Sequence, residues 1–188
     1  MRIYLASDSR RRYVLMQRLG LDFDVLSPKI DETLNLEDVK ELVLVLARAK
    51  AEDVIKRNDL TSGIVIGADT VGTISNEILG KPKSQEDAVD LLKKMSGRSH
   101  YVYTGIYVID LDKNREREHL ERTKVTFFDL SDEDINNYIQ TGEYRDKAGS
   151  YGIQGKGGLL VRSIEGDYYN VVGLPIARLR RMLRELGV

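Results

Sequence analysis

The chain has 188 residues, and its 29 lysines and arginines against 30 aspartates and glutamates give a formal net charge of −1. This balance argues against a nucleic-acid-binding protein, because such proteins usually carry a basic excess. There is no cysteine and there are only two histidines, which excludes disulfides, thiolate catalysis and histidine-rich metal centres. No apolar stretch has the length of a signal peptide or a membrane span, so we expect a cytoplasmic protein with no membrane partner, folded as one domain over residues 1–188.

Strand and helix patterns alternate along the chain, which predicts a mixed α/β protein. Ser9, Ser84 and Ser131 are N-cap candidates, and Gly20 and Gly142 are candidate helix stops. The predicted elements, in order, are strand 2–7, helix 9–19, strand 23–28, helix 36–57, strand 63–71, helix 84–95, a hairpin of 100–110 and 117–130, helix 131–142, a glycine-rich loop at 149–158, strands 159–164 and 168–173, and a helix whose first turn contains Pro175.

Asp69 is the most informative acidic residue, because it lies in the apolar run GIVIGADTV. A buried carboxylate costs several kcal/mol unless it is paired, hydrogen-bonded or bound to a metal. Asp69 is therefore either a strand-end residue that accepts backbone hydrogen bonds or a functional acid. Three further charged residues also have an ordinary structural explanation that needs no function. Lys50 extends the apolar stripe of helix 36–57 and could simply snorkel to water, while Lys81 and Glu32 lie in predicted loops.

The stretch LASDSRRR, residues 5–12, carries three arginines into the first turn of a helix, where the helix dipole disfavours cations. An anion bound at this turn would remove that cost, because free backbone N–H groups and guanidinium groups both bind phosphate. A solvated charge run is the competing interpretation. Neither GxxxxGK[ST] nor GxGxxG is present. Acids, separated cations and the lack of a nucleophile–histidine pair suit a metal ion that bridges carboxylates and a polyphosphate, with water as the attacking group.

Seven segments together resemble the Maf family of nucleotide pyrophosphatases, also known as septum-formation inhibitors, and they run in family order over nearly the whole chain. The first corresponds to the family's LASxSPRRxxLL opening, in which Arg10 replaces a proline. The segments are LASDSRRRYVLMQRLG (5–20), LARAKA (46–51), GADTV (67–71), LGKP (79–82), MSGRSHYVYTG (95–105), DKAGSYGIQGKGG (146–158) and YYNVVGLP (168–175).

The resemblance implies a fold similar to inosine triphosphate pyrophosphatases, with a mixed sheet in an elongated two-lobed body around a central cleft. It implies hydrolysis of a nucleoside triphosphate to the monophosphate and pyrophosphate, with Mg²⁺, or Mn²⁺ or Co²⁺ in its place. By resemblance Asp69 is the proton acceptor, and Glu32 joins it at the metal. The substrate-binding residues that the resemblance implies are Ser7, Ser9, Arg11, Arg12, Lys50, Thr70, Lys81 and Gln154.

Two patterns place the chain closer to one branch of the family. GADT and SYGIQG resemble the branch that acts on dTTP, UTP and related pyrimidine nucleotides, whereas a sister branch prefers 7-methyl-GTP. Arg11, Thr70 and Gln154 occupy the positions tied to this choice. The resemblance also allows a homodimer. The alternative function is a non-hydrolysing, nucleotide-binding regulator of septum formation that acts through a partner.

Overall fold

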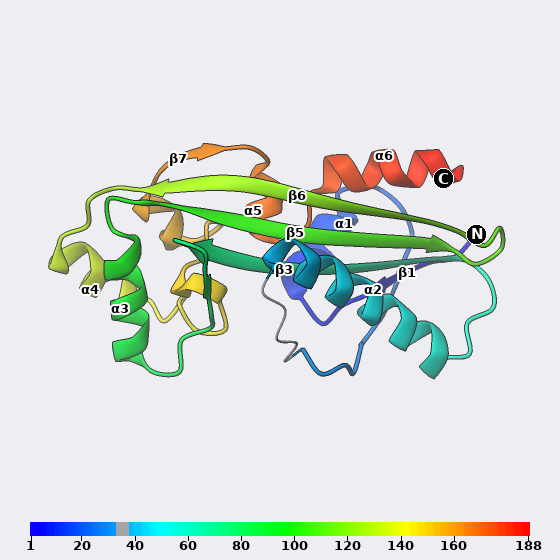
Figure 1. The fold of residues 1–188 in the computed structure, drawn as a ribbon, viewed down its shortest axis with the longest axis horizontal. Helices are drawn as coiled ribbons and strands as arrows, with labels where there is room; N and C mark the ends of the chain where they lie inside the picture. The colour runs from blue at the N-terminus through cyan, green and yellow to red at the C-terminus, as the bar shows by residue number, and fades with distance from the viewer. Residues whose placement is uncertain (33–37) are drawn as a thin grey trace. The chain divides into compact units, whose positions relative to one another are not determined.

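A computed structural model describes residues 1–32 and 38–188. The chain divides into two compact units: residues 1–70, 103–121 and 173–188 form unit 1, and residues 71–102 and 122–172 form unit 2. The elements in chain order are β1 (Ile3–Ala6), α1 (Arg10–Gln17), β2 (Asp24–Leu26), α2 (Val39–Arg57), β3 (Ile64–Ile74), β4 (Glu77–Leu79), α3 (Gln85–Met95), β5 (Ser99–Asp110), β6 (Arg115–Phe127), α4 (Asp132–Gln140), the short 3-10 helices η1 (Ala148–Ser150) and η2 (Lys156–Leu160), β7 (Val161–Glu165), α5 (Tyr168–Val172) and α6 (Ile176–Leu186) (Figure 1).

The strands among the described residues form one seven-stranded mixed sheet of order β2-β1-β3-β5-β6-β7, with β4 paired to β3. β1 pairs in parallel with both β2 and β3, while the pairs β3–β4 and β6–β7 are antiparallel. This sheet, with its helices, confirms the predicted mixed α/β class. In the described part of the chain, no helix has the length and apolar composition needed to cross a bilayer.

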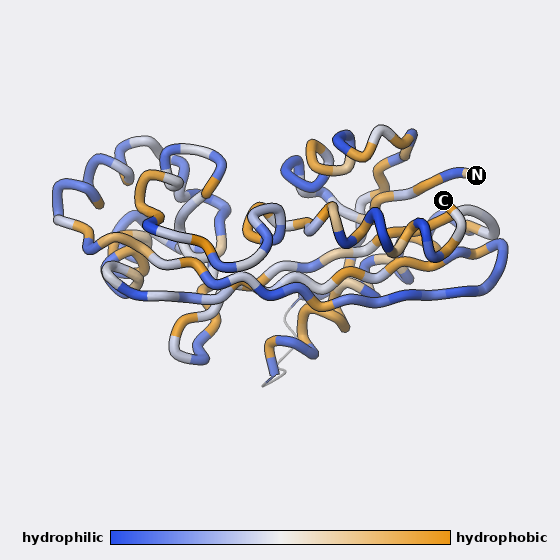
Figure 2. The backbone as a smooth tube through the Cα atoms, turned by 90° about the horizontal axis from the view of Figure 1, so that it is seen from above, coloured by the Kyte–Doolittle hydropathy of each residue, from blue (hydrophilic) through white to orange (hydrophobic). Residues whose placement is uncertain are grey.

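In unit 1, α2 covers one face of the strands, and α1 and α6 lie on the other face (Figures 1 and 2). The buried residues of α2 are hydrophobic apart from Lys50, whereas the arm of β6 that leaves the hairpin is hydrophilic, as Figure 2 shows. β3 is buried along nearly its whole length, as its apolar run predicts. A core cluster joins Tyr4, Ala47, Val54, Val65 and Tyr107.

Unit 2 packs its helices around a separate apolar cluster that includes Leu92, Phe127 and Ile135. His100 lies inside this cluster at 1% exposure, edge-on to Phe127, and its Nε2 lies 2.8 Å from the hydroxyl of Tyr151. Because Tyr151 belongs to the glycine-rich stretch, this contact attaches that stretch to β5.

Most predicted elements are confirmed, with bounds that shift by a few residues. Ser9, Ser84 and Ser131 each accept a backbone hydrogen bond as N-caps. The predicted start of the long helix at residue 36 lies outside the described residues; α2 begins at Val39 after the N-cap Asp38.

The prediction of a strand over 168–173 is wrong, since Tyr168–Val172 forms the short helix α5. Its aromatic and β-branched residues favour a strand by propensity, but long-range hydrogen bonds decide the conformation. The buried Asn170 donates from Nδ2 to the carbonyl of Val102 at 3.0 Å and to Thr123 Oγ1 at 2.9 Å. The sequence patterns also missed β4, which follows a turn where Ser75 and Asn76 adopt positive φ.

Candidate active site

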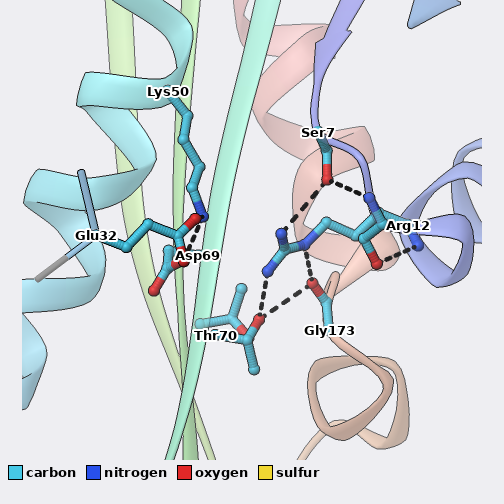
Figure 3. A network of polar contacts seen from close by, with 9 residues as sticks. Ser7, Arg12, Glu32, Lys50, Asp69, Thr70 and Gly173 are labelled. Carbon is cyan, nitrogen blue, oxygen red and sulfur yellow. Dashed lines mark hydrogen bonds and ion pairs between the residues drawn. The ribbon is translucent and has the colours of Figure 1, made fainter. Parts of the chain in front are cut away.

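Asp69 lies in β3 with only 6% of its surface exposed. Its Oδ1 lies 2.6 Å from Nζ of Lys50, and the same ammonium group lies 2.7 Å from Oε1 of Glu32 (Figure 3). Asp69 is therefore not merely a strand-end residue that accepts backbone hydrogen bonds. It belongs to a cluster of two carboxylates on one buried cation, which we call the acid–lysine cluster (Glu32, Lys50 and Asp69).

Lys50 does not snorkel to water, because its residue exposure is only 5%. Its ammonium group is held among opposite charges, which offsets the cost of taking both Lys50 and Asp69 out of water. Glu32 is the accessible member of the cluster, with 57% of its side chain exposed. One side of the cluster is thus open to solvent, while Asp69 stays sheltered.

Two glycines explain why α2 brings Lys50 so close to the sheet. A Cβ atom on Gly67 would lie 2.0 Å from the carbonyl oxygen of Ala47, and a Cβ on Gly105 would lie 2.3 Å from another α2 carbonyl. Only glycine permits such a close approach of helix backbone to sheet. Lys50 follows Ala47 by one helical turn, and Asp69 follows Gly67 on the same face of β3. The glycine of GADT therefore positions the ion pair.

Thr70 follows Asp69 in β3, so its side chain points to the opposite face. Its Oγ1 accepts a hydrogen bond from Nη2 of Arg12 at 2.9 Å. The same oxygen lies 2.9 Å from Oγ1 of Thr104 in β5, and it donates to the carbonyl oxygen of Gly173 at 3.2 Å. Figure 3 shows this second group on the other side of β3 from the acid–lysine cluster.

Arg12 reaches the same carbonyl from α1. Its Nε donates to Gly173 O at 2.9 Å, and its Nη1 lies 3.5 Å from Ser7 Oγ. The side chain is buried, and this desolvation lowers the pKa of Arg12, an effect that the negative charge of Asp69 partly offsets. We call the group of Ser7, Arg12, Thr70, Thr104 and Gly173 the arginine network.

The turn before α1 uses its serines to hold the backbone. Ser9 Oγ accepts from the backbone N–H of Arg12 at 3.4 Å, and Ser7 Oγ accepts from the N–H of Ser9 at 3.2 Å. Arg10 and Arg11 are exposed, while Arg12 turns inward. The three arginines of LASDSRRR are therefore not one solvated run, because Arg12 is buried and its neighbours are exposed.

Lys81 and Gln154 belong to unit 2, and both are exposed. The backbone N–H of Gly149 donates to the carbonyl of Gly80 at 3.0 Å, which joins the LGKP loop to the glycine-rich stretch that carries Gln154. Lys81 and Gln154, the two predicted substrate-binding residues of unit 2, therefore lie on loops that are hydrogen-bonded to each other.

The sequence did not single out Thr104, Gly105 or Gly173 as site residues. A weak signal existed for all three, because Thr104 and Gly105 stand inside the quoted segment MSGRSHYVYTG and Gly173 stands inside YYNVVGLP. Gly173 has φ +124, a backbone conformation that favours glycine. No sequence pattern predicts the hydrogen bond between Thr104 and Thr70.

The acid–lysine cluster fits a hard divalent cation. The described residues contain no group of three or more histidine, aspartate or glutamate side chains that could hold a metal ion. Mg²⁺ does not require such a group, because it is commonly held by one or two carboxylates and substrate phosphates. The carboxylates of Asp69 and Glu32, which share one ammonium group, supply oxygen donors of that kind.

Comparison with known proteins agrees with the resemblance. The family model described as "Maf-like protein" matches residues 2–186. A dTTP/UTP pyrophosphatase of Carboxydothermus hydrogenoformans is 48% identical over 187 residues, which cover 100% of both chains. A dTTP/UTP pyrophosphatase of Clostridium beijerinckii is 46% identical over 188 residues, 99% of this chain and 100% of the relative.

Among solved structures, the Staphylococcus aureus Ham1 protein is similar with a TM-score of 0.49 and 18% identity, over 69% of this chain and 73% of that one. The family model and the full-length relatives carry the assignment: the chain belongs to the Maf family.

Proposed function

We propose that this protein, as a single domain over residues 1–188, hydrolyses dTTP, UTP and related pyrimidine nucleotides to the monophosphate and pyrophosphate. The buried carboxylate of Asp69, paired with Lys50 and next to Glu32, is the observation that carries the proposal. The full-length relatives named dTTP/UTP pyrophosphatase support the same reaction.

In the reaction, a water oxygen bonds to the α-phosphorus, the bond from that phosphorus to the β-phosphate oxygen breaks, and pyrophosphate leaves. Asp69 accepts the proton of the water. Lys50 fixes the Asp69 carboxylate in one orientation through a contact of 2.6 Å, and a fixed base needs little rearrangement in the transition state.

Asp69 and Glu32 are the residues that would hold the divalent cation, with Mg²⁺ as our first choice. Such a cation would neutralise charge on the phosphate oxygens. Arg11 and Lys81 are proposed to bind the polyphosphate, since both are exposed cations. The amide of Gln154 is proposed to pair with the carbonyl and N–H of a pyrimidine. Arg12 and Thr70 are hydrogen-bonded to each other, so we propose for them a role other than binding the polyphosphate or the base.

A non-hydrolysing regulator of septum formation is the alternative function. A protein that only binds nucleotide has no need of an acid beside the phosphates. Asp69 is buried at a cost that such a protein could avoid. The acid–lysine cluster therefore favours the hydrolase.

The decisive experiment is pyrophosphate release with Mg²⁺ from dTTP, UTP, CTP, ATP, GTP and 7-methyl-GTP, with Asp69→Asn beside the wild type. Release from dTTP and UTP that disappears in Asp69→Asn supports the proposal. Release from 7-methyl-GTP alone would overturn the proposed substrate. Tight nucleotide binding without any release would favour the regulator.

A further inference from the structure

The hydroxyl group of Thr70 has three partners inside the protein. A threonine hydroxyl has one proton and two acceptor positions. In the arginine network its oxygen accepts from Arg12 Nη2 at 2.9 Å, lies 2.9 Å from Thr104 Oγ1, where either hydroxyl can donate, and lies 3.2 Å from the carbonyl oxygen of Gly173, which can only accept. Thr70 therefore serves the protein's own structure in this arrangement.

Arg12 uses three of the five N–H donors of its guanidinium group in internal contacts. Each of its three guanidinium nitrogens has a partner, namely Gly173 O, Ser7 Oγ and Thr70 Oγ1. Its residue exposure is 9%, whereas the neighbouring Arg11 is exposed. An arginine that binds a polyphosphate must direct its N–H donors away from the protein interior, towards the ligand. Arg11 meets this condition, whereas Arg12 is buried and directs three of its donors to partners inside the protein.

The arginine network connects three segments that are far apart in the sequence. Ser7 precedes α1, Thr70 follows the acid of the site, and Gly173 precedes α6. The carbonyl of Gly173 receives donors from both Arg12 and Thr70. This double contact fixes the Thr70 end of the peptide that joins Asp69 to Thr70. Since Asp69 is attached to the same peptide, its carboxylate orientation depends on this contact as well as on Lys50.

We propose that Arg12 is a positioning residue for the hydrolysis proposed above: through Thr70 and Gly173 it fixes the backbone that carries Asp69, and it does not contact the triphosphate. The inference rests on the proposed function, because it assigns Asp69 as the base. It predicts that Arg12 affects turnover and leaves the binding of phosphate groups almost unchanged.

The test compares Arg12→Met with Arg11→Met as the matched control. Binding of Mg²⁺–pyrophosphate by calorimetry is measured together with kcat and KM for dTTP. We expect Arg12→Met to lower kcat about 100-fold, as a displaced catalytic group does, with pyrophosphate affinity within about threefold of wild type. Arg11→Met should weaken pyrophosphate binding about tenfold or more, as loss of a charge-assisted contact does.

Two variants of Thr70 separate positioning from general loss of structure. Thr70→Val removes the hydroxyl group, while Thr70→Ser retains it, so we expect a loss of kcat in the first and rescue in the second. Since Arg12 and Thr70 act as one unit, the double variant Arg12→Met/Thr70→Val should be no slower than the worse single variant. If Arg12→Met does not fold, the comparison of Thr70→Val with Thr70→Ser still tests whether the Thr70 hydroxyl group is needed for turnover.

The inference is overturned if Arg12→Met loses pyrophosphate affinity as strongly as Arg11→Met, or if the effects of Arg12→Met and Thr70→Val multiply. Equal losses in Thr70→Val and Thr70→Ser would also overturn it. Failure of the proposed function looks different: the wild type itself would then release no pyrophosphate from any nucleotide.

Discussion

Nζ of Lys50 lies 2.6 Å from Oδ1 of Asp69, and both residues are nearly inaccessible to water. Neither charge is tolerable alone in that place, since an unpaired buried ion costs several kcal/mol. The pair also explains how one helix and one strand define the site. α2 supplies the cation and β3 supplies the acid, and the glycine contact between them sets the distance.

Replacement of Lys50 by methionine should destabilise the protein by about 3 kcal/mol, because it leaves the Asp69 carboxylate buried without its cation. Urea unfolding gives the free energy directly. The double variant Lys50→Met/Asp69→Asn should recover part of the loss, since no unpaired charge remains. If Lys50→Met were as stable as wild type, the ion pair would not be offsetting the burial of Asp69.

Gly67→Ala should destabilise the protein by about 1 to 3 kcal/mol, because the added Cβ would lie 2.0 Å from the carbonyl oxygen of Ala47. The helix must shift, and Lys50 moves away from Asp69 with it, so activity should fall as well. Gly80→Ala is the matched control, since nothing lies within 4 Å of a Cβ built there. Thermal unfolding and pyrophosphate release measure the two effects; equal behaviour of both variants would contradict the explanation.

Local chemistry predicts most of the fold. The N-caps Ser84 and Ser131 are confirmed because a cap depends on residues within one helical turn of it. Helix α5 could not be predicted in this way, because the bonds of Asn170 to Val102 and Thr123 join residues far apart in sequence. Tertiary contacts override propensity at that segment.

In the candidate site, too, some features follow from the local sequence and others depend on tertiary contacts. The burial of Asp69 could be predicted from its apolar neighbours, and it is confirmed at 6% exposure. Arg12 lies on the same face of α1 as the buried Leu15 and Met16, three and four residues later, so helical spacing favours its burial over that of Arg10 and Arg11. Its partners Gly173 and Thr70 could not be predicted, because they lie far away in the sequence.

Glu32→Gln should raise the Mg²⁺ concentration needed for half-maximal activity about tenfold, since one of the two proposed metal carboxylates becomes neutral. Because its side chain is 57% exposed, we expect little change in stability. Glu41→Gln, an exposed acid in the first turn of α2, is the control and should leave the Mg²⁺ dependence unchanged. Titration of activity against Mg²⁺ tests this, and an identical curve for Glu32→Gln would remove Glu32 from the metal site.

His100 should make stability depend on pH below neutrality. Burial lowers its pKa from 6.5 to about 4. Its Nδ1 is also buried, without a hydrogen-bond partner among the described residues. Between these two values the unfolded chain binds more protons than the folded one. The contribution of His100 is therefore complete above pH 6.5 and is lost as the pH falls towards 4, by about 3 kcal/mol in all.

The chain has only two histidines, so proton NMR can follow the ring of His100 directly. We expect its C–H signals to stay unshifted down to about pH 5. In urea unfolding, His100→Gln should flatten the pH dependence of stability between pH 6.5 and 4, whereas His119→Gln should retain it. An imidazole at position 100 that titrates near pH 6.5 would show that the charged ring is tolerated in the core of unit 2, and the predicted loss of stability would not occur.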